Sequence, residues 1–106
     1  MSYRFMRVIV MFDLPMISSQ EKREYRRFRK FLISNGFIMM QQSVYSKLAL
    51  NNTVATTIIK NVKQNKPKDG LVQMLTITEK QYNRMEFVVG EFNSDTLNSD
   101  ERMVVF

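Results

Sequence analysis

The sequence contains no cysteine and no histidine among its 106 residues. These absences exclude disulfides, thiol nucleophiles, imidazole general bases and nearly every zinc or copper site. Any bound metal is therefore expected to be a hard ion held by oxygen atoms. Mg²⁺ or Mn²⁺ on a carboxylate, completed by waters and substrate phosphates, is the form that such a site takes.

Glycine and long hydrophobic runs are also scarce. With only three glycines, the chain has no P-loop and no glycine-rich dinucleotide loop, so a backbone cradle for phosphate is not expected. The first apolar run is too short to span a bilayer and ends in an acid. These features predict a soluble, cytoplasmic protein without membrane contact.

The length and hydrophobic content of the chain suffice for one compact domain. Hydrophobic residues make up 44% of the chain, which gives only a modest core at this length, and burial across a homodimer would add to it. The net charge of +6 indicates an anionic partner.

Asp13 is the most informative single residue. It ends the β-branched apolar run from Arg7 to Asp13, which reads as a buried strand, and Pro15 then breaks the pattern. A carboxylate at the rim of a core needs a cation, a metal or a hydrogen-bonding cap. From its position alone, Asp13 is equally expected to bind a metal or to cap the following loop.

The positive charge is concentrated between Ser18 and Gly36. A Ser18-x-x-Glu21 capping box and a glycine at the end predict a helix here. On a helical wheel, Glu24, Tyr25, Phe28, Phe31 and Leu32 share one arc. The other arc is cationic, which favours contact with nucleic-acid phosphates over a merely solvated face. Its members are Lys22, Arg23, Arg26, Arg27, Arg29 and Lys30.

The remaining chain completes an α+β pattern. Residues 37–48 read as two short strands with a break near the paired glutamines, followed by a helix capped by Asn52 or Thr53 that stops before Pro67. Its expected buried face consists of Val54, Ile58, Ile59 and Val62. A strand over 71–77 follows, and then Thr78-x-x-Gln81, which resembles a second capping box and predicts a short helix. The order β-α-β-β-α-β predicts a ferredoxin-like sandwich with both helices on one face of an antiparallel sheet.

The C-terminal part departs from a minimal sandwich. Residues 87–89 could form one more strand, and residues 1–90 are expected to form the ferredoxin-like domain. Residues 91–106 are expected to form a polar linker and a strand that docks on a partner chain, because apolar residues at a free end need a sheet edge to cover them. The docking residues are Met103, Val104, Val105 and Phe106.

Three segments in order resemble a known family. They are Met11-Phe12-Asp13-Leu14-Pro15, the basic helix ending Phe28-Arg29-Lys30-Phe31-Leu32-x-x-x-Gly36-Phe37, and Gln42-Ser43-Val44-Tyr45. Together they are similar to CRISPR-associated protein two, the small subunit of the CRISPR spacer-acquisition complex, and most similar to its type II members. The resemblance spans essentially the whole chain.

The resemblance implies a fold and a set of partners. It implies a ferredoxin-like homodimer in which the two copies of Asp13 face one another across the interface. It also implies C-terminal strands that add to the neighbouring sheet. The dimer would bridge two dimers of the CRISPR-associated integrase and hold double-stranded DNA along its basic surface.

The family also carries a disputed metal-dependent cleavage of RNA or DNA, assigned to the aspartate. One carboxylate per chain is too few for a two-metal phosphodiesterase, although two copies of Asp13 could share one Mg²⁺. Without histidine, hydroxide would have to come from water on that metal. Met39 or Met40 also stands where nuclease-reported relatives often have an arginine. These points favour a non-catalytic, DNA-bridging subunit.

Two alternatives stay open. The first is a magnesium-dependent endonuclease that cuts RNA or DNA with the Asp13 pair. The second is a generic RNA-binding ferredoxin-like domain, which would need aromatic residues on its sheet face. Phe5, Phe12 and Tyr45 supply a few, but the sequence has no segment of the RNP type.

Overall fold

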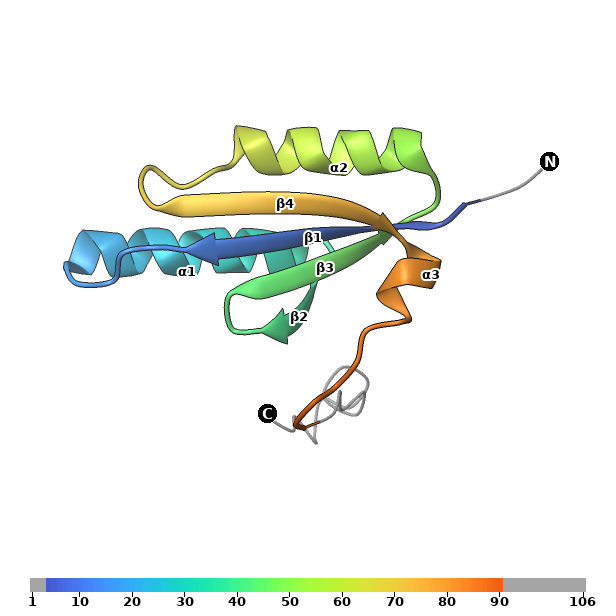
Figure 1. The fold of residues 1–106 in the computed structure, drawn as a ribbon. Helices are drawn as coiled ribbons and strands as arrows, with labels where there is room; N and C mark the ends of the chain where they lie inside the picture. The colour runs from blue at the N-terminus through green and yellow to red at the C-terminus, as the bar shows by residue number, and fades with distance from the viewer. Residues whose placement is uncertain (1–3, 91–106) are drawn as a thin grey trace.

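The structure, a computed structural model, describes residues 4–90 of the chain. The order of its elements confirms the predicted β-α-β-β-α-β pattern and the short helix expected after the last strand (Figure 1). The elements are β1 (Met6–Asp13), α1 (Ser19–Ser34), β2 (Ile38–Gln41), β3 (Val44–Ala49), α2 (Asn52–Gln64), β4 (Leu71–Thr78) and α3 (Glu79–Tyr82).

The four strands form one antiparallel sheet in the order β2-β3-β1-β4. The central strand β1 pairs with β3 from Met6 to Met11 and with β4 along its whole length, where Asp13 lies opposite Leu71. This arrangement confirms the ferredoxin-like fold. The break predicted near the glutamines is the turn at Gln42 and Ser43 that joins β2 to β3.

The core lies between the sheet and the two long helices. Alternate residues of β1 enter it, because successive strand side chains point to opposite faces. They meet two buried residues of α1 and three of α2. The buried residues are Met6, Val8, Val10 and Phe12 of β1, Phe28 and Leu32 of α1, and Ala55, Ile58 and Val62 of α2. Both helices therefore cover one face of the sheet, as predicted.

Two predictions for α2 are wrong. Asn51, not Asn52 or Thr53, is the N-cap, and its side chain accepts a hydrogen bond from the backbone N–H of Val54. Val54 was expected on the buried face but lies in the exposed first turn, and Ala55 takes the inward position instead. The buried stripe is Ala55, Ile58 and Val62 at the i, i+3, i+7 spacing, and Ile59 packs against it partly buried.

Within residues 4–90, the opposite face of the sheet carries no long helix, and it is called here the open face. Near one end of it, the guanidinium of Arg7 bonds both carboxylate oxygens of Glu79, at 2.9 and 2.6 Å, and lies 4.2 Å from the ring centroid of Tyr82. The hydroxyl of Tyr82 lies 3.4 Å from that of the buried Ser46. These contacts hold α3 against the open face.

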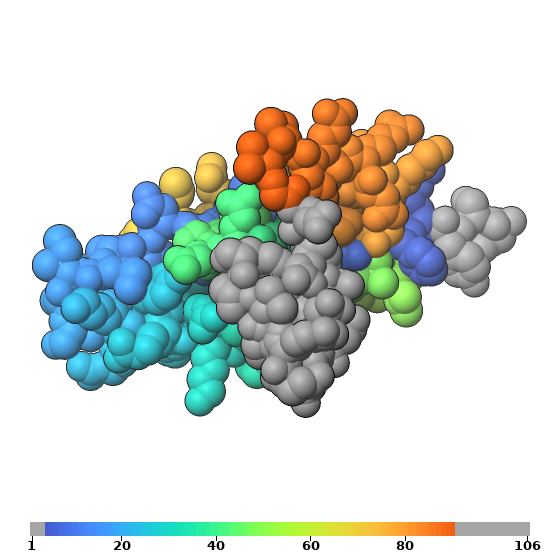
Figure 2. Space-filling view, turned by 90° about the horizontal axis from the view of Figure 1, so that it is seen from below, coloured from blue at the N-terminus to red at the C-terminus, as the bar shows by residue number. Residues whose placement is uncertain are grey.

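The strand expected at residues 87–89 is wrong. The chain after α3 is irregular through Gly90, and Val88 and Val89 are 92% and 90% exposed. A strand needs a partner to satisfy its backbone, and this segment pairs with no strand among residues 4–90. Figure 2 shows this orange-red segment at the surface. The docking strand predicted at Met103–Phe106, and the linker before it, lie outside the described residues.

Candidate active site

Asp13 is the last residue of β1 and is exposed at the strand's end. The strand delivers it there because Phe12, immediately before it, is buried in the core and donates its backbone N–H to the carbonyl oxygen of Ser43 at 3.0 Å. Within residues 4–90 the carboxylate of Asp13 has no hydrogen bond and no ion pair. A cap on the following loop is therefore not the role that these residues give it.

A shallow groove of about 240 Å³ adjoins Asp13 on the open face. It lies where the end of β1 meets the beginnings of β3 and β4. Most of its lining is apolar. The side chains of Asp13, Ser43 and Gln73 contribute the polar groups. The lining residues are Met11, Phe12, Asp13, Ser43, Val44, Leu71 and Gln73.

The groove offers few ligands for a metal ion. Among residues 4–90, no group of three or more aspartate, glutamate, histidine or cysteine side chains could hold an ion. Mg²⁺ needs fewer protein ligands than zinc does, because it keeps waters and takes substrate phosphates, and one or two carboxylates are enough. The hard oxygen donor at Asp13 fits such an ion, but one chain supplies half of a two-carboxylate site.

The basic helix is α1, which forms the blue-to-cyan left end of the face in Figure 2. Its capping box is as predicted: Ser18 accepts from the N–H of Glu21, and Glu21 accepts from the N–H of Ser18. Phe28 and Leu32 anchor the helix in the core. The six predicted phosphate contacts are all exposed: Lys22, Arg23, Arg26, Arg27, Arg29 and Lys30.

Those six residues are not equivalent. The guanidinium of Arg27 bonds the carboxylate of Glu24 and also donates to the carbonyl oxygens of Asn65 and Lys66 after α2. The side chain therefore ties α1 to the loop before β4. The other five have no such partner among the described residues, and their donors are available to a ligand.

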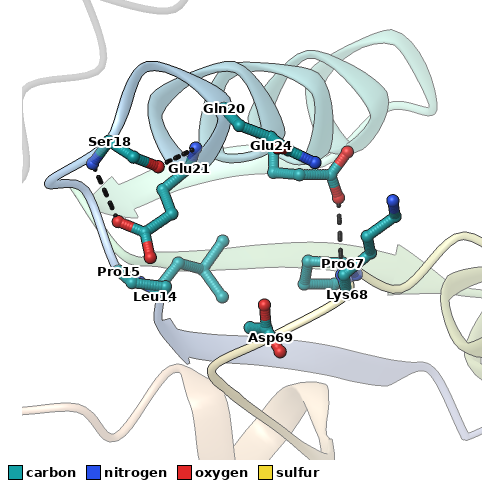
Figure 3. Close-up of a pocket in the computed structure, with 9 residues that line it drawn as sticks. All are labelled: Leu14, Pro15, Ser18, Gln20, Glu21, Glu24, Pro67, Lys68 and Asp69. Carbon is teal, nitrogen blue, oxygen red and sulfur yellow. Dashed lines mark hydrogen bonds between the residues drawn. The ribbon is translucent and has the colours of Figure 1, made fainter.

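A second hollow lies next to the site but does not include Asp13. It has a volume of about 200 Å³ between the start of α1 and the loop before β4 (Figure 3). In Figure 3, Glu21 turns back to Ser18 and Glu24 reaches the backbone of Lys68, so both carboxylates already have partners. The backbone N–H of Ser18 lowers the pKa of Glu21, and the Arg27 side chain lowers that of Glu24.

An aromatic cluster beneath α1 was not predicted from the sequence. The rings of Phe12 and Tyr45 are stacked, with centroids 5.7 Å apart, and Phe12 also contacts Phe28 at 5.2 Å and Tyr25 at 6.0 Å. Tyr45 is fully buried. Alternation along β3 is the signal that could have placed this ring inward, but nothing in the sequence shows which groups its hydroxyl meets.

The fold and these residues define a small ferredoxin-like protein with a lone strand-end carboxylate and a basic helix. The family model for CRISPR associated protein Cas2 matches residues 6–85, and the chain belongs to this family. The resemblance drawn from the sequence is thereby confirmed.

Similar proteins of known name extend over nearly the whole chain. CRISPR-associated endoribonuclease Cas2 from Treponema denticola is 56% identical over 100 residues, which are 94% of this chain and 99% of that protein. The protein of the same name from Streptococcus mutans strain UA159 is 52% identical over 99 residues, or 93% and 91% of the two chains. The crystal structure of Streptococcus pyogenes Cas2 at pH 6.5 covers 78% of this chain and 99% of its own, with a TM-score of 0.58 and 17% identity, and supports the fold.

These relatives overturn one conclusion of the sequence analysis. A non-catalytic, DNA-bridging subunit was favoured there because Met39 or Met40 stands where nuclease-reported relatives often have an arginine and because each chain has one candidate carboxylate. The relatives from T. denticola and S. mutans are instead named endoribonucleases, which favours the nuclease alternative. The structure places both methionines, half-buried, in β2, well removed in sequence from Asp13.

Proposed function

We propose that the chain is a divalent-metal-dependent endoribonuclease in which Asp13 is the metal-binding and catalytic residue. The observation that carries the proposal is the exposed carboxylate of Asp13, which has no partner among residues 4–90 although it ends a strand that the core holds rigidly. Relatives more than half identical are named endoribonucleases. RNA is the substrate that those names support.

The site needs a second carboxylate, and a second copy of the chain is its most economical source. The groove beside Asp13 is mostly apolar, and Leu71 and Leu75 on the same face are 54% and 51% exposed. Burying such side chains against an identical face removes apolar surface from water. A two-fold axis there would bring the two copies of Asp13 toward one another, as the resemblance implies.

Mg²⁺ or Mn²⁺ would be held by the paired Asp13 carboxylates, and when bound it would supply positive charge that activates water and stabilises the phosphate. The chain's own residues would do the rest. Exposed Lys22, Arg23, Arg26, Arg29 and Lys30 would bind phosphates along the RNA strand. The rigid strand would orient the carboxylate.

The test is cleavage of labelled RNA by Asp13→Asn. The variant keeps size and polarity but removes the charge that a divalent ion needs, so we expect cleavage to fall by more than about 100-fold. Asp69→Asn is the matched control, because Asp69 is exposed and lines the neighbouring hollow instead of the groove. Light scattering should give a dimer for the wild type and both variants.

A chelator should abolish wild-type cleavage, and added Mg²⁺ should restore it. Cleavage by Asp13→Asn at the wild-type rate would show that the carboxylate is not part of the active site. The partners that the resemblance implies, the integrase and double-stranded DNA, stay predictions, as do the 1–90 domain and the docking strand at 103–106. So does the cytoplasmic location, for which residues 4–90 offer only the finding that none of their helices is long and apolar enough to cross a membrane.

A further inference from the structure

Arg27 and Glu24 of α1 form a clasp on the loop that joins α2 to β4. The Nε and Nη2 atoms of Arg27 donate to the Glu24 carboxylate at 3.2 and 3.3 Å. Nη2 also donates to the carbonyl oxygens of Asn65 and Lys66, at 3.2 and 3.3 Å. The Glu24 carboxylate in turn accepts from the backbone N–H of Lys68 at 3.4 Å (Figure 3). Two side chains of one helix therefore hold three backbone groups of this loop.

The clasped loop lies against the backbone at the end of β1. Its last residue, Gly70, has a φ of +97°, and a Cβ built on it would lie 2.8 Å from the carbonyl oxygen of Asp13 and 3.1 Å from the Cα of Leu14. The next residue, Leu71, is the sheet partner of Asp13. A residue without a Cβ lets the two backbones approach this closely. A shift of the loop is therefore transmitted to the residue that carries the candidate catalytic carboxylate.

The donors of Arg27 are committed to this clasp. Its side chain is 41% exposed, but two of its three guanidinium nitrogens already have partners. A planar guanidinium can bond a carboxylate and backbone carbonyls together, which the compact ammonium of a lysine does not reproduce. Arg27 thus differs from the other five cations of α1, whose donors are available to a ligand. Its loss should change the place of Asp13 and not the grip on RNA.

We propose that Arg27 is a positioning residue for RNA cleavage: with Glu24 it clasps the loop after α2, and through Gly70 the clasp sets the place at which β1 presents Asp13. The inference rests on the proposed function, because Asp13 is the catalytic residue which that function names. Two carboxylates that share one ion must both reach it at its coordination distance. In a symmetric dimer, a displacement in one chain is repeated in its partner, so the site is sensitive to small shifts.

The test variant is Arg27→Lys, which keeps the positive charge but loses the fork that bonds Glu24 and both carbonyl oxygens. We expect kcat for labelled RNA to fall by about 10- to 100-fold, the cost of a small misplacement of a reacting group, while KM stays within about twofold because the charge is retained. In a two-dimensional NMR spectrum, the backbone amide signals of Asp13 and Gly70 should shift from their wild-type positions. This second readout needs neither metal nor RNA.

Two further variants separate positioning from a general loss of stability. Lys47→Met is the matched control, because Lys47 donates to the backbone carbonyl oxygen of Asn35 at the C-terminal end of α1. It should lower the melting temperature but leave kcat and the Asp13 amide signal unchanged. Glu24→Ala should reproduce the effect of Arg27→Lys. The double variant should lose no more than about twofold further in kcat, because both side chains act through one clasp.

Four results would overturn the inference. They are a wild-type kcat in Arg27→Lys, a loss confined to KM, which would make Arg27 a phosphate contact, an equal loss of kcat in Lys47→Met, or amide signals of Asp13 and Gly70 that do not shift. Failure of the proposed function looks different. Asp13→Asn would then cleave RNA at the wild-type rate, while the amide signals in Arg27→Lys, measured without RNA, would still report whether the clasp positions Asp13.

Discussion

The ion pair between Arg7 and Glu79 joins the start of β1 to the first residue of α3, 72 positions later in the sequence. Both guanidinium contacts are short, at 2.9 and 2.6 Å, and Tyr82 covers the cation at 4.2 Å. The side chain of Arg7 is 10% exposed and that of Glu79 is 24% exposed. The pair is therefore close to buried, and its two members differ in their access to water.

That difference predicts unequal costs when one partner is removed. Breaking a buried pair costs about 3–5 kcal/mol because a charge is left without compensation. Arg7→Met leaves the more exposed carboxylate, which regains some water, so we expect a loss of about 2 kcal/mol in the free energy of unfolding. Glu79→Gln leaves the nearly buried guanidinium and should cost about 3 kcal/mol.

Urea unfolding followed by circular dichroism measures these costs. The double variant Arg7→Met with Glu79→Gln should be more stable, by about 2 kcal/mol, than the sum of the two single effects implies, because the second change removes the charge that the first left unpaired. Single costs below about 0.5 kcal/mol with no coupling would mean that the pair behaves as an exposed surface pair, and the burial argument would be refuted.

Two other predictions concern the junction around the end of β1. Gly70 has a φ of +97°, and an added Cβ would lie 2.8 Å from the carbonyl oxygen of Asp13, so Gly70→Ala should lower the free energy of unfolding by at least about 2 kcal/mol. Gly90→Ala, at a φ of +81° with no neighbour within 4 Å, should cost clearly less. The pKa of Glu21 is lowered by the backbone N–H of Ser18, so its stabilising effect is present above the ordinary pKa of 4.5 and is lost as the pH falls through the lowered value. Melting temperatures down to about pH 3 should therefore decline less steeply for Glu21→Gln than for the wild type.

Local signals predicted most of the fold. The capping boxes at Ser18 and Thr78 are both formed, because each depends on residues only three positions apart. The alternation in β1 and the order of the elements were sufficient for the ferredoxin-like arrangement. The strand predicted at 87–89 failed because β-branched residues indicate extended backbone but not whether another strand is there to pair with it.

The candidate site was predictable only where its signals are local in the sequence. Asp13 was found because a single carboxylate closing an apolar run is visible within a few residues of sequence. The separate role of Arg27 was not, because its partners Asn65 and Lys66 are 38 and 39 positions away. The burial of the Tyr45 hydroxyl could not be predicted from the sequence either, because the burial of one atom depends on how helix and sheet pack together.

The position of Asp13 is set by interactions that do not involve its own carboxylate. β1 pairs on both sides, and Val8, Val10 and Phe12 lie buried beneath the helices. A slip of one residue would move all three onto the open face, so the hydrophobic core fixes the register of the strand. That register places Asp13 beside the groove on the same face as Met11. A carboxylate held by a central strand keeps its place without hydrogen bonds of its own, which leaves its oxygens available to a metal ion.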